Sequence, residues 1–309
     1  MSSPKLSPGL HTFPAPNGLT FRYIVHTTPT PTSTPTPTPT ATKLLLIQCP
    51  GWGMGPYYLM PAFNPLLAQN YTLLFFHPRG SAGSSRPADP STMTTFHMAA
   101  DLELFRQYLG LDQFPAMLGH SHGGTIVLAY AETFPRRVAR LILIDHRLLG
   151  YDDSATFLRF RQEREGDERY AAAYHALHAW PRPATDEELG EFLSEIIPIY
   201  FYDPVANAHT YFETVGDEGF PVWCLQNMKQ YDRALESGKR MVEGLKNVTA
   251  KTLMVFGKQD CQCTTENAEQ TKMLGVHHAD VVLLDQCGHF PWLEKPDETL
   301  RAIKDFLTG

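Results

Sequence analysis

A series of short apolar segments, separated by stretches with helical periodicity, constrains the fold of this chain more than any other feature. The segments have the length and composition of strands that are buried on both faces. They occupy residues 43–49, 71–76, 116–118, 140–144, 251–256 and 279–284. Strands that alternate with helices over short connections predict a mostly parallel sheet with helices on both faces. We therefore expect an α/β protein.

The stretches between and after these strands include three clear helices, each with its apolar residues on one stripe. They are expected at residues 94–109, 123–134 and 296–307. Ahead of the first buried strand, residues 11–16 and 19–26 have the pattern of two further strands. The dipeptide Asn17-Gly18 between them favours a two-residue hairpin turn.

The alternation is interrupted between residues 146 and 248, where no strand segment occurs. This interval is rich in helix-forming and aromatic residues, so we expect a helical cap inserted in the α/β core, with a ligand pocket between cap and core. The predicted organisation is a core over residues 1–145, the cap over 146–248 and the remaining core over 249–309. Within the first part, residues 27–42 alternate Thr and Pro and are predicted to form a loop insertion.

Length and charge limit the possible functions. A chain of 309 residues is long enough for one large domain with an inserted cap. Its net charge of −7 indicates no basic surface for nucleic acid or for an anionic membrane. Five irregularly spaced cysteines, with neither an apolar leader nor a membrane-spanning segment, predict a cytoplasmic protein with reduced thiols. The sequence indicates no particular oligomeric state.

The predicted strand 116–118 is followed by the pentapeptide GHSHG at residues 119–123, and a helix is expected directly afterwards. A strand, a serine between glycines and a helix, in this order, form the nucleophile elbow of the α/β-hydrolase fold. The glycines allow a tight turn that exposes the serine hydroxyl at the edge of the sheet. Ser121 is therefore the candidate nucleophile, and the expected fold is the α/β-hydrolase fold.

A serine hydroxyl needs a base that removes its proton and a carboxylate that orients the base. His289 is the candidate base because it lies in the turn after the last predicted strand and follows the acid in the chain. Asp260 is the favoured acid, since it comes directly after the strand 251–256, at the same edge of the sheet. Asp145, at the end of the preceding strand, and Asp285 remain alternative acids.

The tetrahedral intermediate formed by such a nucleophile carries an oxyanion that needs backbone N–H donors. One donor in this fold is the amide that follows the nucleophile, here that of His122. The second is expected from the glycine-rich loop 50–55, where the Trp52 amide can turn inward. Because no H-E-x-x-H ligand pattern occurs, neither a metal nor another cofactor is expected.

Together these motifs resemble those of the proline iminopeptidase-like branch of the α/β-hydrolase superfamily. Loop 50–55 is similar to that family's H-G-G-P-G element, and residues 77–87 are similar to its D-x-R-G-x-G-x-S-x-R-P stretch. The elbow, GKQD at 257–260 and GHFPWLEKP at 288–296 follow in order, so the resemblance covers nearly the whole chain. The residues that it implies as a catalytic triad are Ser121, Asp260 and His289.

Several positions depart from that family's pattern. Pro50 replaces its loop histidine, Trp52 its second glycine and His77 its aspartate. The family binds a free N-terminal ammonium with cap glutamates near an aromatic pair, whereas residues 208–212 have no carboxylate ahead of their aromatics and only Glu213 follows. Because an unpaired buried ammonium is costly, a small ester or lactone is expected at least as much as a peptide.

The leading prediction is a serine hydrolase that cleaves a small ester or amide through an acyl-enzyme on Ser121. The alternative is a non-hydrolytic acyl transferase, a cyclase or a ligand-binding protein of the same fold in a secondary-metabolite pathway. A small molecule is the expected partner in either case. The candidate substrate-binding residues are Trp52, His120, Tyr211 and Glu213.

Overall fold

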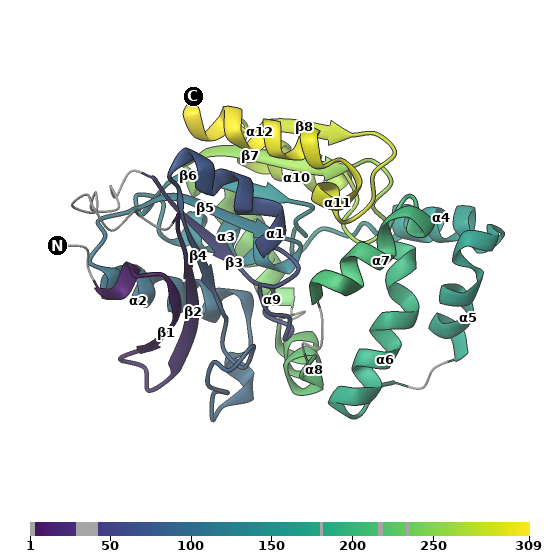
Figure 1. Ribbon diagram of the computed structural model, residues 1–309, viewed down its shortest axis with the longest axis horizontal. Coiled ribbons are helices and arrows are strands. Elements are labelled where there is room, and N and C mark those ends of the chain that lie inside the picture. Colours follow the sequence, from purple (N-terminus) through teal and green to yellow (C-terminus); the bar gives the residue numbers. More distant parts are fainter. Residues whose placement is uncertain (1–3, 29–42, 180–181, 216–218, 233–234) are drawn as a thin grey trace.

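The computed structural model describes residues 4–28, 43–179, 182–215, 219–232 and 235–309 (Figure 1). All but the first two residues of the predicted Thr/Pro loop, 27–42, lie outside these ranges. Within them, eight strands form one sheet in the order β1-β2-β4-β3-β5-β6-β7-β8. The strands are β1 Gly9–Pro14, β2 Thr20–His26, β3 Leu44–Gln48, β4 Thr72–Phe76, β5 Phe114–His120, β6 Val138–Ile144, β7 Lys251–Gly257 and β8 Asp280–Leu284.

Strands β3 to β8 run parallel to one another, whereas β2 pairs antiparallel with both β1 and β4. The parallel strands correspond to the six apolar segments of the sequence, and their ends differ from the predicted ones by at most two residues. Their continuous apolar character follows from burial on both faces. In β5, for example, Ala116 and Leu118 pack in one hydrophobic core and Met117 packs in the other.

The N-terminal hairpin has a longer turn than the two-residue turn predicted at Asn17-Gly18. The backbone N–H of Ala15 donates to Leu19 O at 2.8 Å, and that of Gly18 donates to Ala15 O at 3.1 Å. The turn therefore runs over three residues, 16–18, and Gly18 takes the left-handed conformation, with φ of 83°, that such a turn requires. The predicted hairpin is confirmed and its predicted turn length is wrong.

Helices cover both faces of the sheet, and they include the three helices predicted from periodicity. Helices α2, α3, α9 and α10 contribute to the hydrophobic core on one face, and α1 and α12 contribute to the core on the other. The helices of the core are α1 Met60–Phe63, α2 Thr95–Leu109, α3 His122–Thr133, α10 Glu266–Leu274, α11 Pro291–Glu294 and α12 Pro296–Thr308. Short 3₁₀ turns lie at η1 Pro4–Leu6, η3 Asn64–Gln69, η4 Pro90–Thr92, η5 Glu168–Tyr170, η6 Ile197–Tyr200 and η7 Leu245–Asn247.

Between β6 and β7 the described residues form helices and no strand, as the sequence predicts. These helices are α4 Ser154–Glu165, α5 Ala171–Ala179, α6 Asp186–Ile196, α7 Pro204–Val215, α8 Val222–Tyr231 and α9 Leu235–Gly244. In Figure 1, α4 to α7 project to one side of the sheet, whereas α9 lies beneath it. Met241 of α9 is part of the core that α2 and α3 share with the sheet. The cap boundaries at 146 and 248 therefore stay a prediction.

The helix α6 begins with a capping box, in which the Thr185 hydroxyl accepts from the backbone N–H of Glu188 and the Glu188 carboxylate accepts from that of Thr185. This fixes the start of the helix. Among the described residues, no helix combines the length and the apolar character needed to cross a membrane.

Candidate active site

Ser121 forms the turn between β5 and α3. Its φ of 53° and ψ of −125° lie in a region that residues other than glycine rarely adopt. Neither glycine of the pentapeptide tolerates a side chain, because a Cβ on Gly119 would collide with the Gly123 carbonyl and a Cβ on Gly123 with the Gln48 carbonyl. The GHSHG sequence thus permits a strained turn that holds Ser121 at the carboxyl end of the sheet, where it lines a cavity.

Asp260 follows β7 and His289 follows β8, so both lie at this same edge of the sheet. Their side chains are buried and hydrogen bonded, with 2.7 Å between His289 Nδ1 and Asp260 Oδ2. Asp260 Oδ1 accepts from the backbone N–H groups of Gln262 and Cys263, at 2.7 and 3.2 Å. These bonds compensate the carboxylate for its lost contact with water. An acid held in this way can keep the proton of His289 on Nδ1 and leave Nε2 as a base.

Ser121 and His289 line the same cavity. The hydrogen bonds of the described residues do not include one between their side chains. Such contacts are often long in the absence of substrate and shorten when it binds. The backbone N–H of His289 donates to Tyr200 O at 2.7 Å, which fixes the turn that carries the imidazole. The structure therefore brings the predicted nucleophile and base to one cavity.

The alternative acids have different environments from that of Asp260. Asp145 is fully buried, and its Oδ1 accepts from the backbone N–H of Gly257 at 3.0 Å. Burial, together with the neighbouring Asp260, raises the pKa of Asp145 well above its ordinary value. Asp285 is two-thirds exposed, with a side-chain accessibility of 67%, and pairs with Lys258 at 3.8 Å. A carboxyl group whose uncharged form is favoured by burial and a solvated carboxylate are both less suited than Asp260 to orient a catalytic imidazole.

The two residues whose amides are the expected oxyanion donors, Trp52 and His122, line the same cavity as Ser121. His122 is the first residue of α3, so its backbone N–H has no partner within the helix. Trp52 lies in the loop after β3 and lines the cavity, and its ring stacks on Phe220 with 6.2 Å between the ring centroids. No described residue accepts a hydrogen bond from the Trp52 amide. The role of both amides as oxyanion donors stays a prediction.

His120 also lines the cavity, but its two ring nitrogens are engaged within the protein. Tyr58 Oη lies 3.0 Å from Nδ1, and Nε2 lies 2.8 Å from the backbone oxygen of His289. Since a carbonyl oxygen only accepts, Nε2 carries the proton and Nδ1 accepts from the tyrosine. Burial, reinforced by the nearby His289, lowers the pKa of His120 well below its usual value. This neutral ring supports the turn of His289.

The cavity around Ser121 has a volume of about 320 Å³ and is mostly apolar. One wall comes from the apolar stripe of α6 and the turn after it. The residues of this wall are Leu189, Phe192, Leu193, Ile196 and Ile197. The sequence analysis did not single out these residues, although their spacing of three and four positions is the signal of a helix face that packs against something. Arg147, Lys229 and Asp232 add polar groups to the lining.

The four candidate substrate-binding residues separate into two groups. Trp52, His120 and Tyr211 line the cavity. Glu213 lies outside it, with a side-chain accessibility of 64%, and pairs with His209 at 3.7 Å. The position of Glu213 on α7 explains the difference. Residues two positions apart point about 200° apart around a helix, so a buried Tyr211 turns Glu213 outward.

Among the residues that the structure describes, two sets of side chains could be considered as metal ligands, His120 with Asp145 and His289, and Asp260 with Cys263 and His289. In each set the ligand atoms lie within 4.8 Å of one another. Both sets include nitrogens that already bind protein groups, so a metal would have to break those hydrogen bonds. The expected absence of a metal stays a prediction.

The five cysteines are free and buried. Burial raises the pKa of the Cys261 thiol to about 11 and that of Cys263 well above its usual value. Thiols that remain protonated are weak nucleophiles. The cysteines next to Asp260 therefore act as packing groups.

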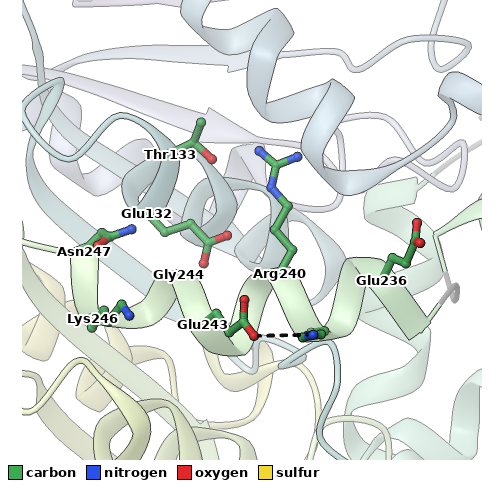
Figure 2. Close-up of a pocket in the computed structure, with 9 residues that line it drawn as sticks. Glu132, Thr133, Glu236, Arg240, Glu243, Gly244, Lys246 and Asn247 are labelled. Carbon is green, nitrogen blue, oxygen red and sulfur yellow. Dashed lines mark ion pairs between the residues drawn. The ribbon is translucent and has the colours of Figure 1, made fainter.

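A second hollow, of about 560 Å³, lies between α3 and α9 (Figure 2). Its lining residues are Glu132, Thr133, Glu236, Lys239, Arg240, Glu243, Gly244, Lys246 and Asn247. Glu132 is 4% exposed and its Oε2 has no hydrogen-bond partner among the described residues. Burial raises the pKa of Glu132 to about 9, against the opposing effect of Arg240. No serine and histidine pair lines this hollow, so we do not assign it to the reaction.

Comparison with known proteins supports the same fold. Residues 45–296 match the family described as alpha/beta hydrolase fold. The proline iminopeptidase of Saccharolobus solfataricus is 25% identical over 263 residues, 81% of this chain and 80% of that protein. The proline iminopeptidase of Heyndrickxia coagulans is 27% identical over 261 residues, 79% of this chain and 83% of that protein. An esterase from Rhodococcus sp. ECU1013 has a TM-score of 0.67 at 17% identity, over 97% of this chain and 99% of that one.

Proposed function

Because this chain belongs to the α/β-hydrolase family, on its proline iminopeptidase-like branch, we propose that it is a serine hydrolase that acts through an acyl-enzyme on Ser121. The observation that supports the proposal is that Ser121, in a strained turn at the end of β5, and His289 line one cavity, and that His289 is hydrogen bonded to Asp260.

In the proposed reaction, Ser121 Oγ attacks the carbonyl carbon of the substrate while His289 Nε2 accepts the hydroxyl proton. The imidazolium then donates this proton to the leaving alcohol or amine, and a water molecule repeats the sequence to release the acid. Asp260 stabilises the imidazolium and keeps the Nδ1 proton in place. The amides of His122 and Trp52 stabilise the oxyanion of each tetrahedral intermediate.

The lining of the cavity favours an ester or lactone over a peptide with a free N-terminus. Among the described lining residues the only carboxylate is Asp232, and both of its oxygens already accept hydrogen bonds from Thr95. A substrate ammonium would therefore lack a dedicated partner, and burying such a charge costs several kcal/mol. The apolar wall from α6 suits a short aliphatic or aromatic group.

Labelling with a fluorophosphonate tests the mechanism. The intact wild-type protein should gain one adduct, and the Ser121→Ala variant should gain none. A wild-type protein without an adduct, or a variant with the same adduct, would refute the acyl-enzyme.

Rates on p-nitrophenyl acetate, p-nitrophenyl butyrate and proline β-naphthylamide test the substrate class. We expect clear turnover of both esters and little of the naphthylamide. The reverse order would identify a peptidase and contradict the preference for esters.

A further inference from the structure

The imidazole of His122 joins three parts of the chain that are distant in sequence. Its Nδ1 lies 3.0 Å from the backbone N of Gly51, in the loop after β3. Its Nε2 lies 3.0 Å from Thr95 Oγ, at the start of α2, and 3.3 Å from Asp232 Oδ2, directly after α8. Thr95 and Asp232 are buried, at 0% and 4% exposure.

The donors and acceptors of this network determine which ring nitrogen of His122 carries the proton. The Gly51 N–H can only donate, so His122 Nδ1 must be an acceptor and the ring proton lies on Nε2. The Thr95 hydroxyl donates to Asp232 Oδ2 at 2.5 Å and its backbone N–H donates to Asp232 Oδ1 at 2.7 Å. The Asp232 carboxylate therefore faces the protonated side of the imidazole and favours that tautomer.

The imidazole of His122 connects this network to the two proposed oxyanion donors. The backbone N–H of His122 is one donor, and the side chain of the same residue holds Gly51, whose neighbour Trp52 supplies the other. The His122 side chain therefore links the loop of one proposed donor to the helix that begins with the other.

We propose that Asp232 is a positioning residue, which holds His122 in the tautomer that binds Gly51 and thereby sets the spacing of the two oxyanion donors. The inference rests on the proposed function. Asp232 belongs to the segment between β6 and β7, so this segment acts on the reacting carbonyl as well as enclosing it. Asp232 plays no part in proton transfer to the substrate.

The substitution Asp232→Asn tests the proposal because it preserves size. The Asn Oδ1 can still accept from the Thr95 N–H, but its amide N–H groups would face His122 Nε2. The ring would then accept at Nε2 and carry its proton on Nδ1, opposite the Gly51 N–H. Since removal of one oxyanion donor costs about 10²- to 10³-fold in kcat, a displaced donor should lower kcat by about 10- to 100-fold with little change in KM.

Asp101→Asn is the matched control. Asp101 is equally buried, at 1% exposure, and accepts from Arg79 and Asn17, which neither belong to the network nor line the cavity around Ser121. Loss of its charge should leave kcat unchanged. Thermal unfolding of both variants and of the wild type establishes that each one is folded at the temperature of the assay.

The ¹⁵N NMR spectrum of the histidine side chains gives a readout that is independent of activity, with His122 assigned by its loss in a His122→Gln variant. The wild type should show a proton on Nε2 of His122, and Asp232→Asn should show it on Nδ1. A wild-type ring with its proton on Nδ1, or a folded Asp232→Asn protein with wild-type kcat, would overturn the proposal. Failure of fluorophosphonate to label Ser121 in the wild type would instead contradict the proposed function and leave the tautomer result standing.

Discussion

Asp260 and Glu132 are both buried carboxyl groups beside hollows in the molecule, but their surroundings are opposite. Asp260 has a hydrogen-bond donor at each oxygen, and one of them is His289. Glu132, near the far end of α3, has an Oε2 without a partner among the described residues, and burial raises its pKa to about 9. Ser121 and His289 line the cavity next to Asp260, whereas no serine or histidine is among the described residues that line the hollow beside Glu132. Directed hydrogen bonds and the chemistry of the lining therefore distinguish the candidate site from the second hollow.

Asp260→Asn is expected to give the largest effect. The Asn amide would oppose the proton on His289 Nδ1 and favour the wrong tautomer of the base. We expect kcat on p-nitrophenyl butyrate to fall by about 10⁴-fold. Steady-state kinetics, with thermal unfolding as a check on folding, measures the loss.

Asp145→Asn is the control for this substitution, because it makes the same replacement of a carboxyl group by an amide in the neighbouring buried acid. Burial already favours the uncharged form of Asp145, so an uncharged amide should lower kcat far less. A large fall of kcat in Asp145→Asn, together with a nearly unchanged kcat in Asp260→Asn, would show that Asp145 and not Asp260 orients His289.

Glu132→Gln is expected to change stability and to leave kcat unaltered. The pKa of Glu132 is raised to about 9 in the folded protein, compared with about 4.3 in an unfolded chain. Between these values the folded state binds a proton that the unfolded state has lost, so the wild type should lose up to about 1.4 kcal/mol of stability per pH unit as the pH rises. Glutamine has no such proton, and the free energy of unfolding of the variant should decline less from pH 5 to pH 9.

Urea unfolding across this pH range measures the slope for Glu132→Gln. Glu243→Gln is the matched control, because Glu243 lines the same hollow but is exposed and pairs with Lys239 at 3.9 Å (Figure 2). Loss of this exposed ion pair should change the free energy of unfolding by less than about 1 kcal/mol at any pH. Equal slopes for the wild type and Glu132→Gln would contradict the raised pKa.

Glu213→Gln is expected to give the smallest effect. Glu213 is a carboxylate outside both hollows, and its only described ion pair is an exposed one with His209. Neither kcat/KM on esters nor that on proline β-naphthylamide should change. A selective loss on the naphthylamide would mean that Glu213 binds the substrate ammonium after all.

The strands could be predicted from the sequence because burial on both faces leaves a run of apolar residues with little ambiguity. Chain order then placed Ser121, Asp260 and His289 at one edge, since parallel strands end together there. The hairpin turn was harder to predict. Asn17-Gly18 is compatible with two turn lengths, and the choice depends on the bond between Ala15 and Leu19.

Contacts between distant residues account for most of what the sequence could not reveal. Asp232 binds Thr95, 137 positions away, and no local pattern marks either residue. The apolar stripe of α6 can be recognised in the sequence, but its spacing does not show whether the stripe faces a hydrophobic core or a cavity. The outward position of Glu213 could have been predicted from the sequence. Glu213 lies two residues after Tyr211, and residues two positions apart point in nearly opposite directions around a helix.

The turn at Ser121 has a consequence for how this chain can change over time. A residue with φ of 53° in that region of the map stores strain that the rest of the sheet must hold. Replacement of Ser121 by glycine would relieve the backbone strain, but it would also remove the proposed nucleophile. A substitution that stabilises the fold at this position therefore abolishes the proposed reaction. At Ser121, folding free energy and reactivity therefore favour different residues.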